Sequence, residues 1–172
     1  MIREFEGHFP KIGKGTIIDE TSVVIGKVTM GEDCNVLPLC VIRGDVNEIT
    51  IGHKTNIQDG SVLHVSHQGK FNPEGAELII GSEVSVAHRV TLHGCKIGNQ
   101  CMIGMGSIIT DNAIIEDQVM IGSGTLVPPG KRLESGYLYL GNPVRQVRKL
   151  SEQEIEHMIY IAQYYVDLKD RF

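Results

Sequence analysis

Two stretches of the sequence decide the fold: Ile57-Gln58-Asp59-Gly60-Ser61-Val62-Leu63-His64 and, further along, Val86-Ala87-His88-Arg89-Val90-Thr91-Leu92-His93. In each stretch an aliphatic residue returns after six positions. Counting in sixes beyond them finds eighteen such positions, which we call the hexad leaders: Ile12, Ile18, Val24, Met30, Val36, Ile42, Ile51, Ile57, Leu63, Ile80, Val86, Leu92, Ile97, Ile103, Ile109, Ile115, Ile121 and Val127. A period of six fits neither a helix nor alternating hairpin strands, but it fits short parallel strands separated by turns. The sequence therefore predicts an all-β solenoid whose leaders fill the axis; a β-sandwich of short strands is the alternative.

The count in sixes also shows where the solenoid is interrupted. Three extra residues follow the hexad that Ile42 leads, so residues 46–50 should protrude at a corner. A longer interruption, residues 65–78, contains Gly and Pro and should form a loop that leaves the coil beside His64. Because loops on rigid scaffolds often have functional roles, this position draws attention to the histidine.

The ends of the chain read differently from the repeats. We expect residues 1–11 to cover the first coil, and residues 131–150 to form an extended exit once the regular coils have ended. Ser151 and Glu154 have the spacing of a capping box, and apolar residues then recur at helical spacing as far as residue 170. The chain therefore divides into a solenoid, residues 1–150, and a C-terminal amphipathic helix, residues 151–172, packed on it or on a neighbour.

Three histidines gain a meaning from the repeat. The hexads resemble those of the left-handed parallel β-helix family, which implies three hexads in each coil. Arg43, His64 and His93 then all directly follow a leader on the same face, so they should form an outward-facing stack. Stacked strands lie about 4.8 Å apart, and two nitrogens on one tetrahedral zinc ion lie roughly 3.4 Å apart. His88 falls around a corner, where it most easily reaches the His64–His93 site of a neighbouring subunit. Three nitrogen ligands with one open position are typical of catalytic zinc.

The stretch Asn56-Ile57-Gln58-Asp59-Gly60-Ser61-Val62-Leu63-His64, together with His88, His93 and the upstream Arg43-Gly44-Asp45, resembles the γ-class carbonic anhydrases and their bacterial relatives. The resemblance covers almost the whole chain. It implies a left-handed parallel β-helix of about six three-hexad coils with a C-terminal α-helix, assembled as a homotrimer. It also implies reversible hydration of CO2 to bicarbonate by a metal-bound hydroxide, with Zn2+ as the metal and Fe2+ or Co2+ as alternatives.

The resemblance assigns roles to further residues. It implies that Arg43 and Asp59 pair across the subunit interface, that Gln58 contacts metal-bound solvent or bicarbonate, and that Tyr165 on the terminal helix leans toward the metal. Asp45 belongs to the same matching motif. Each has a structural alternative: Asp45 and Asp59 could bond their own corners, and Tyr165 could pack at an interface.

The proton path departs from the family pattern. A glutamate of the best-characterised type, just after the Arg-x-Asp aspartate, is replaced here by Val46, and the loop after His64 is not acidic near its start. Its first titratable group is His67, and an imidazole suits proton export near pH 7. We therefore predict that His67 is a partial proton shuttle and that hydration is weak or strongly buffer-dependent. A solvated loop histidine is the simpler interpretation.

Composition narrows the function classes. The 172 residues have a net charge of −5 and no basic run, which disfavours nucleic acid or an anionic membrane as a partner. Met1 leads directly into charged residues and no segment approaches a membrane span, so neither a signal peptide nor a membrane anchor is expected. Four cysteines then favour the reducing cytoplasm, with the thiols packed in the solenoid.

Hexads are shared with many acyltransferases, so two alternatives remain. The first is a coenzyme-A-dependent acyltransferase that uses His67 as its base and needs no metal. The second is a metal-stabilised scaffold trimer without turnover. Metal analysis separates the first alternative from the other readings, and a CO2 hydration assay separates the second from the enzyme.

Overall fold

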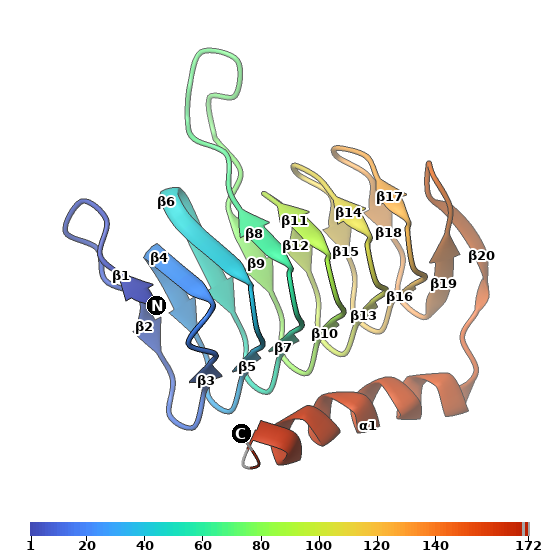
Figure 1. The fold of residues 1–172 in the computed structure, drawn as a ribbon. Coiled ribbons are helices and arrows are strands. Elements are labelled where there is room, and N and C mark those ends of the chain that lie inside the picture. The colour runs from blue at the N-terminus through green and yellow to red at the C-terminus, as the bar shows by residue number, and fades with distance from the viewer. Residues whose placement is uncertain (170, 172) are drawn as a thin grey trace.

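The hexad leaders form the axis of a parallel β-solenoid in the computed structural model, which describes residues 1–169 and 171. All sixteen leaders from Val24 to Val127 are buried, and Ile12 and Ile18 are partly buried against them. Each coil has three short strands, and one helix runs along the outside (Figure 1). The predicted fold class is confirmed.

The strands stack into three faces. The first, which we call the histidine face, is built from β1 (Ile2–Arg3), the first part of β4 (Val23–Met30), the first part of β6 (Val41–Ile51), β8 (Val62–His64), β11 (Thr91–His93), β14 (Ile108–Ile109) and β17 (Leu126–Val127). The second, the open face, is built from β2 (Lys11–Ile12), the later parts of β4 and β6, β9 (Leu78–Ile80), β12 (Lys96–Ile97), β15 (Ile114–Ile115) and β18 (Arg132–Leu133).

The third face lies under the helix, and we call it the helix face. Its parallel strands are β3 (Ile17–Ile18), β5 (Asn35–Val36), β7 (Asn56–Ile57), β10 (Ser85–Val86), β13 (Met102–Ile103), β16 (Met120–Ile121) and β19 (Tyr137–Leu140). The antiparallel strand β20 (Arg145–Lys149) closes this sheet at the C-terminal end.

Strand pairing confirms three hexads per coil. Lys96 lies opposite Ile114, and Ile114 lies opposite Arg132, so partners in the regular coils are eighteen residues apart. Small residues at the corners join successive coils: the Ser61 hydroxyl donates to the Ala87 carbonyl at 3.0 Å and accepts the Val90 N–H at 3.1 Å. The repeat also continues further than expected, because Leu133 and Tyr139 of the expected exit segment occupy the axis of one more coil.

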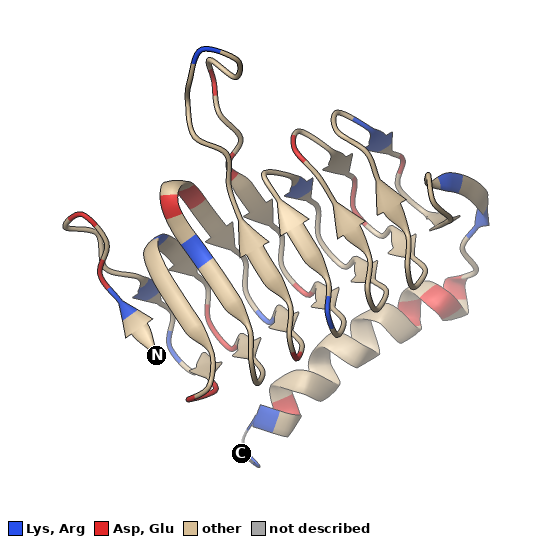
Figure 2. Cartoon of the chain, turned by 45° about the horizontal axis from the view of Figure 1, so that its top comes forward, with Lys and Arg blue, Asp and Glu red and all other residues tan. Residues whose placement is uncertain are grey.

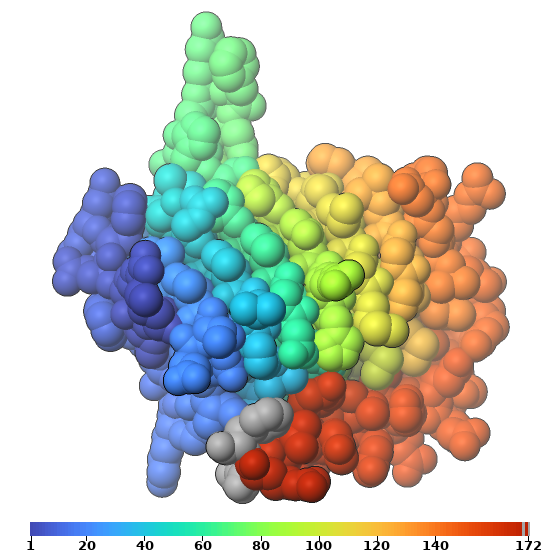
Figure 3. All heavy atoms as spheres, in the orientation of Figure 1, coloured from blue at the N-terminus to red at the C-terminus, as the bar shows by residue number. Residues whose placement is uncertain are grey.

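Both interruptions of the repeat lie beside the histidine face. Pairing between β4 and β6 jumps from Gly26–Gly44 to Val28–Ile49, so residues 45–48 bulge outward although β6 is continuous. Residues 65–77, which we call loop 65–77, leave the coil directly after His64 and return to β9. The loop stands out from the body as a narrow projection (Figure 3). Both features match the expected interruptions.

Helix α1 (Glu152–Lys169) begins with the predicted capping box and covers the helix face. Ser151 N–H donates to Glu154 Oε2 at 2.9 Å, and Glu154 N–H donates to Ser151 Oγ at 3.2 Å. Met158 and Ala162 are buried against the sheet. At the other end, Lys169 donates to Gly15 O at 2.7 Å and pairs with Asp33. Residues 170 and 172 of the expected helical segment lie outside the described residues.

Acidic and basic residues are interspersed over the coils (Figure 2), and the net charge is −5. The four cysteines are buried free thiols, and burial raises the pKa of Cys95 and of Cys101 to about 12, which confirms the packing interpretation. Within residues 1–169 and 171, no helix is long and apolar enough to cross a membrane.

Candidate metal centre

His64 and His93 form a pair on the histidine face. They are register partners in β8 and β11, and Nδ1 of His64 lies 3.1 Å from Nε2 of His93. Arg43 continues the stack in β6, because Ile42 pairs with Leu63. The predicted column of Arg43, His64 and His93 is therefore present.

A carboxylate holds the outer nitrogen of each ring. Asp45 Oδ1 lies 2.9 Å from Nε2 of His64, and Asp111 Oδ1 contacts Nδ1 of His93. Arg43 pairs with Asp45 from the other side. A carboxylate that accepts the outer N–H of a metal-ligating histidine fixes the tautomer and orientation of its ring.

The titration of these groups follows from their contacts. Burial lowers the pKa of His64, and the charges of Arg43 and His93 act in the same direction against the opposing effect of Asp45. For Asp45, burial alone would raise the pKa, but hydrogen bonds from Arg43 and His64 outweigh it and the pKa is lowered. Asp111 likewise has a lowered pKa because hydrogen bonds from Ser66 and His93 outweigh burial. Both carboxyl groups are thus ionised near neutral pH.

This arrangement creates a site for a cation. An ionised carboxylate only accepts hydrogen bonds, and a neutral imidazole has a single N–H. When both rings are neutral, each gives its N–H to its carboxylate, and two acceptor nitrogens then face each other at 3.1 Å. A divalent metal held by these two nitrogens would satisfy both, and the spacing is close to the roughly 3.4 Å of two nitrogens on tetrahedral zinc. The residues therefore fit a metal.

His88 lies apart from this pair. It stacks on Asp59 at the corner between the helix face and the histidine face, because Val86 pairs with Ile57. Its Nδ1 lies 2.9 Å from Asp59 Oδ2, and its ring is about half exposed. Among residues 1–169 and 171, no group of three His, Cys, Asp or Glu side chains is arranged to hold a metal within one chain.

Two further predicted residues lie beside Asp59, the residue that contacts His88. Gln58 is buried next to Asp59 and donates its amide to Asn56 Oδ1 at 3.0 Å. Tyr165 lies on α1, where burial and then the charge of Asp59 raise the pKa of its hydroxyl. Asn35 also donates to the Tyr165 carbonyl, which ties this part of α1 to the helix face. Within one chain, the predicted residues thus separate into two half-sites.

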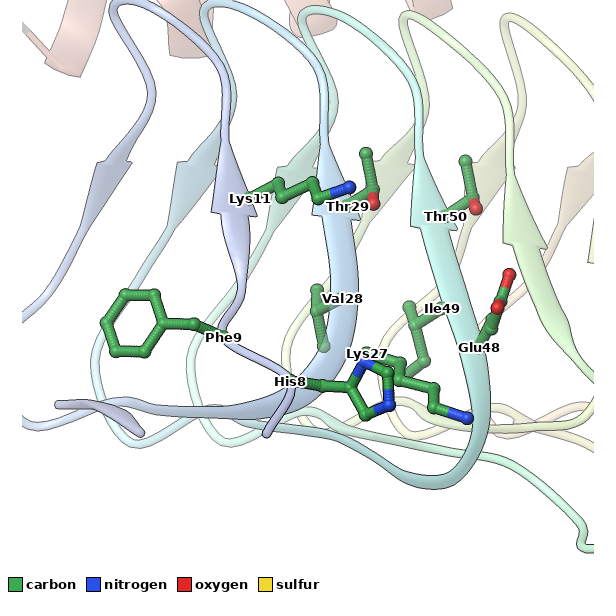
Figure 4. A pocket seen from close by; sticks show the side chains of 9 residues that line it. All are labelled: His8, Phe9, Lys11, Lys27, Val28, Thr29, Glu48, Ile49 and Thr50. Atoms are coloured by element: carbon green, nitrogen blue, oxygen red, sulfur yellow. The ribbon is translucent and has the colours of Figure 1, made fainter. Parts of the chain in front are cut away.

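His67 is exposed at the start of loop 65–77. It lines a groove together with Asp45, Val46 and Glu48. Another pocket lies under the N-terminal segment, between His8, Lys27 and Thr50 (Figure 4), and none of the predicted site residues lines it. The groove at His67 thus extends to Asp45, the residue that contacts His64.

Sequence reasoning missed Asp111. In the sequence, residues 97–127 consist of regular hexads and indicate a scaffold without a reactive group. The structure corrects this, because Asp111 contacts His93 and also accepts the Ser66 hydroxyl at 2.6 Å. The signal was available in the repeat: Leu92 pairs with Ile109, so Asp111 stands one coil beyond His93 and one position past it.

Comparison with known proteins finds similarity to hexapeptide-repeat proteins and to carbonic anhydrases. Residues 94–129 match the model of the bacterial transferase hexapeptide family (six repeats). Protein YrdA of Escherichia coli K12 is 55% identical over 172 residues, which is 100% of this chain and 94% of that protein. A carbonic anhydrase of Geobacillus kaustophilus is 41% identical over 97% of this chain and 88% of its own length. Gamma carbonic anhydrase 2, mitochondrial, of Arabidopsis thaliana is 36% identical over 92% of this chain and 57% of its own length.

A solved structure shares the fold throughout. The crystal structure of a hexapeptide transferase family protein from Anaplasma phagocytophilum matches with a TM-score of 0.92 at 32% identity, over 100% of this chain and 98% of that one. The repeat, the histidine arrangement and these relatives agree. The chain belongs to the γ-carbonic-anhydrase-like family of hexapeptide-repeat proteins.

Proposed function

We propose that this protein is a γ-type carbonic anhydrase that reversibly hydrates CO2 to bicarbonate. In this proposal His64 and His93 of one subunit and His88 of a neighbouring subunit hold a divalent metal, Zn2+ or alternatively Fe2+ or Co2+. When bound, such a metal supplies a Lewis acid that lowers the pKa of water toward neutrality. The observation that supports the proposal best is the pair of facing nitrogens, 3.1 Å apart, each ring held from behind by a carboxylate.

The trimer in this proposal is supported by the separation of the half-sites. His88 points away from its own His64–His93 pair around a corner, so only a second copy can bring the three rings together. Four of the exposed apolar residues lie on the histidine face and its corner, where such a copy would pack: Val62 (41% exposed), Ile108 (43%), Met105 (54%) and Leu39 (67%). Packing against a neighbour would bury this apolar surface.

The remaining residues would prepare the site for the reaction. Asp45 and Asp111 hold His64 and His93 in fixed tautomers, and Asp59 does the same for His88. Arg43 would pair with Asp59 of the neighbour in addition to its own Asp45. Gln58 and Tyr165 would approach the metal from the subunit that donates His88, and Gln58 would orient bicarbonate or solvent. His67 would take up the released proton through the groove that it shares with Asp45.

A hydration assay tests this function. Protein loaded in turn with Zn2+, Fe2+ and Co2+ is mixed with CO2 in a stopped-flow instrument, and proton release is followed with a pH indicator. We expect hydration above the buffer rate with at least one metal, and loss of that rate in His93→Ala. No hydration with any of the three metals would contradict the enzymatic proposal and favour a metal-stabilised scaffold.

A second candidate, a coenzyme-A-dependent acyltransferase, is favoured by one finding: the matching repeat model describes transferases. It requires His67 as a base and no metal. Metal-free protein would then bind coenzyme A in calorimetry and release free thiol from acetyl-coenzyme A. Neither result is expected here, because the three carboxylate-held histidines have no role in acyl transfer of that kind.

A further inference from the structure

The base of loop 65–77, which we call its neck, consists of Ser66 and Ala76 and contacts the residues that hold the histidine pair. Ser66 and Ala76 form an antiparallel bridge, with N–H to O distances of 2.9 and 3.0 Å. The Ser66 hydroxyl then donates to Asp111 Oδ2 at 2.6 Å. Because Asp111 Oδ1 contacts Nδ1 of His93, a continuous chain of hydrogen bonds joins the neck of the loop to the imidazole.

The bulge of β6 is joined to the same neck. Asn47 donates its side-chain amide to the Ser66 carbonyl at 3.1 Å. Asn47 lies two residues from Asp45, which holds His64. Ser66 therefore contacts both segments whose carboxylates orient the histidine pair.

Two glycines show how closely these groups approach one another. A Cβ on Gly94, directly after His93, would lie 2.6 Å from Ala76 Cβ and 2.8 Å from Asp111 Oδ1. A Cβ on Gly75 would lie 2.8 Å from Ser66 O and 2.9 Å from Asn47 Nδ2. Both glycines also have positive φ, +52° and +68°, which other residues rarely adopt. Glycine at these two positions therefore leaves room for the neck of the loop to pack against Asp111 and His93.

We propose that Ser66 is a positioning residue for the metal ligand His93, acting through Asp111, and that it couples the order of loop 65–77 to occupancy of the metal centre. This inference rests on the proposed metal centre. Asp111 has two oxygens, and each has one partner: Ser66 fixes the carboxylate that fixes the ring. Without the hydroxyl, Asp111 can rotate and His93 loses its set orientation.

The coupling acts in both directions. Linkage requires that any factor by which an ordered loop raises metal affinity is also the factor by which bound metal favours the ordered loop. Removing the residue that hydrogen-bonds the other ring nitrogen of a metal-ligating histidine typically lowers metal affinity by about 10- to 100-fold. That range applies to Asp111→Asn. Ser66 is one bond further out, so Ser66→Ala should lower metal affinity by about threefold to tenfold, the usual worth of one hydrogen bond.

The loop offers a place for a reporter. Phe71 lies at the outer part of the loop and is 94% exposed, and the protein contains no tryptophan. F71W therefore introduces a single tryptophan, which can be excited apart from the five tyrosines, on the outer part of the loop. Co2+ is the metal probe, because its visible absorption reports its ligands directly. The buried cysteines do not compete for it, since their thiols have raised pKa values.

The experiment compares four proteins in the F71W background, all at a concentration where they are fully assembled: the parent, Ser66→Ala, Ser66→Thr and Ser107→Ala. Ser107 is the matched control, because its hydroxyl also makes one hydrogen bond, to Gly122 O at 3.1 Å, but lies away from the loop. Co2+ affinity is measured by absorption, and loop order by time-resolved fluorescence anisotropy of the tryptophan with and without Co2+, which measures its local motion.

We expect Co2+ to reduce the fast local motion of the tryptophan in the parent, in Ser66→Thr and in Ser107→Ala. Ser66→Ala should bind Co2+ about threefold to tenfold more weakly and show no metal-induced loss of that motion. Equal affinity and an equal effect of Co2+ on the motion in Ser66→Ala and the parent would overturn the coupling while leaving the metal centre in place. A parent that binds no Co2+ would overturn the metal centre and the coupling together.

Discussion

His64 and His93 lie opposite each other in paired strands, with ring centroids 5.1 Å apart and ring planes at 61°. This relationship exists because loop 65–77 leaves and rejoins the solenoid without disturbing its register. Leu63 still pairs with Leu92, as a regular coil requires. The insertion that separates the two histidines in sequence therefore also supplies Ser66, which contacts the carboxylate behind His93.

Metal removal should weaken the assembly. A site shared between chains binds only the associated state, so metal binding stabilises the trimer by linkage. After chelation and dialysis, the melting temperature should fall and should depend more steeply on protein concentration. Differential scanning fluorimetry at several concentrations measures both, with metal content checked by mass spectrometry. An unchanged melting temperature in metal-depleted protein would count against a shared site.

His67→Ala should slow CO2 hydration in dilute buffer by roughly tenfold or more, the usual worth of a positioned acid–base group. The reason is that His67 shares a groove with Asp45 and can export a proton near neutral pH. Added imidazole should restore the rate, and metal content should stay the same. His53→Ala is a matched control on a remote corner, where His53 Nδ1 accepts the Glu32 N–H. Equal rates for His67→Ala and the parent would show that His67 has no role in CO2 hydration.

Glu154 should give α1 a stability that disappears in acid. Hydrogen bonds from Arg148, and from the backbone of Ser151, lower the pKa of Glu154 to about 2. The unfolded value is about 4.3. Because the folded pKa is the lower one, this contribution is complete above about pH 4.3 and is lost as the pH falls toward 2. Glu154→Gln should therefore lower the melting temperature at pH 7 and have progressively less effect below pH 4.3. Glu152→Gln, in the same helical turn, is the control; the same pH profile for both variants would contradict the assignment.

Gly94→Ala should be more destabilising than an equivalent change elsewhere. Gly124 has a similar positive φ, +71°, but nothing within 4 Å of a Cβ placed on it. Gly124→Ala should then cost only the left-handed backbone strain, about 1–2 kcal/mol. Gly94→Ala adds a collision with Ala76 and Asp111, worth about 1–3 kcal/mol more. Urea unfolding at one protein concentration compares the two, and equal costs would show that the neck of the loop gives way easily.

Much of the fold could be predicted from the sequence because a six-residue period has few structural solutions. The axial residues, the loop after His64 and the capping box at Ser151 follow from spacing, whereas the coil of three hexads was implied by the resemblance to the left-handed β-helix family. The end of the repeat was less visible. Leu133 and Tyr139 occupy leader positions, but the Pro128-Pro129-Gly130 stretch before them is typical of a turn that ends a regular repeat.

The candidate site was predictable only in part. The stacking of His64 and His93 follows from register alone, whereas Asp111 depends on which side chain leans back across a coil. Arg43 shows the same limit, since its pairing with Asp45, two residues away, depends on side-chain geometry. Local spacing determines which residues share a face, but the partner of each charged group depends on side-chain geometry that a single sequence does not specify.

Mixed trimers test the shared metal centre most directly. His88→Ala and His93→Ala chains with different tags are co-expressed, and the mixed trimers are purified by both tags in succession. His88 of one chain would meet His64 and His93 of the next, so every mixed trimer contains one intact site, whichever chain is in the majority. We predict one metal per mixed trimer and no bound metal in either single-variant trimer. Mixed trimers without metal, or full metal content in either single-variant trimer, would contradict the account.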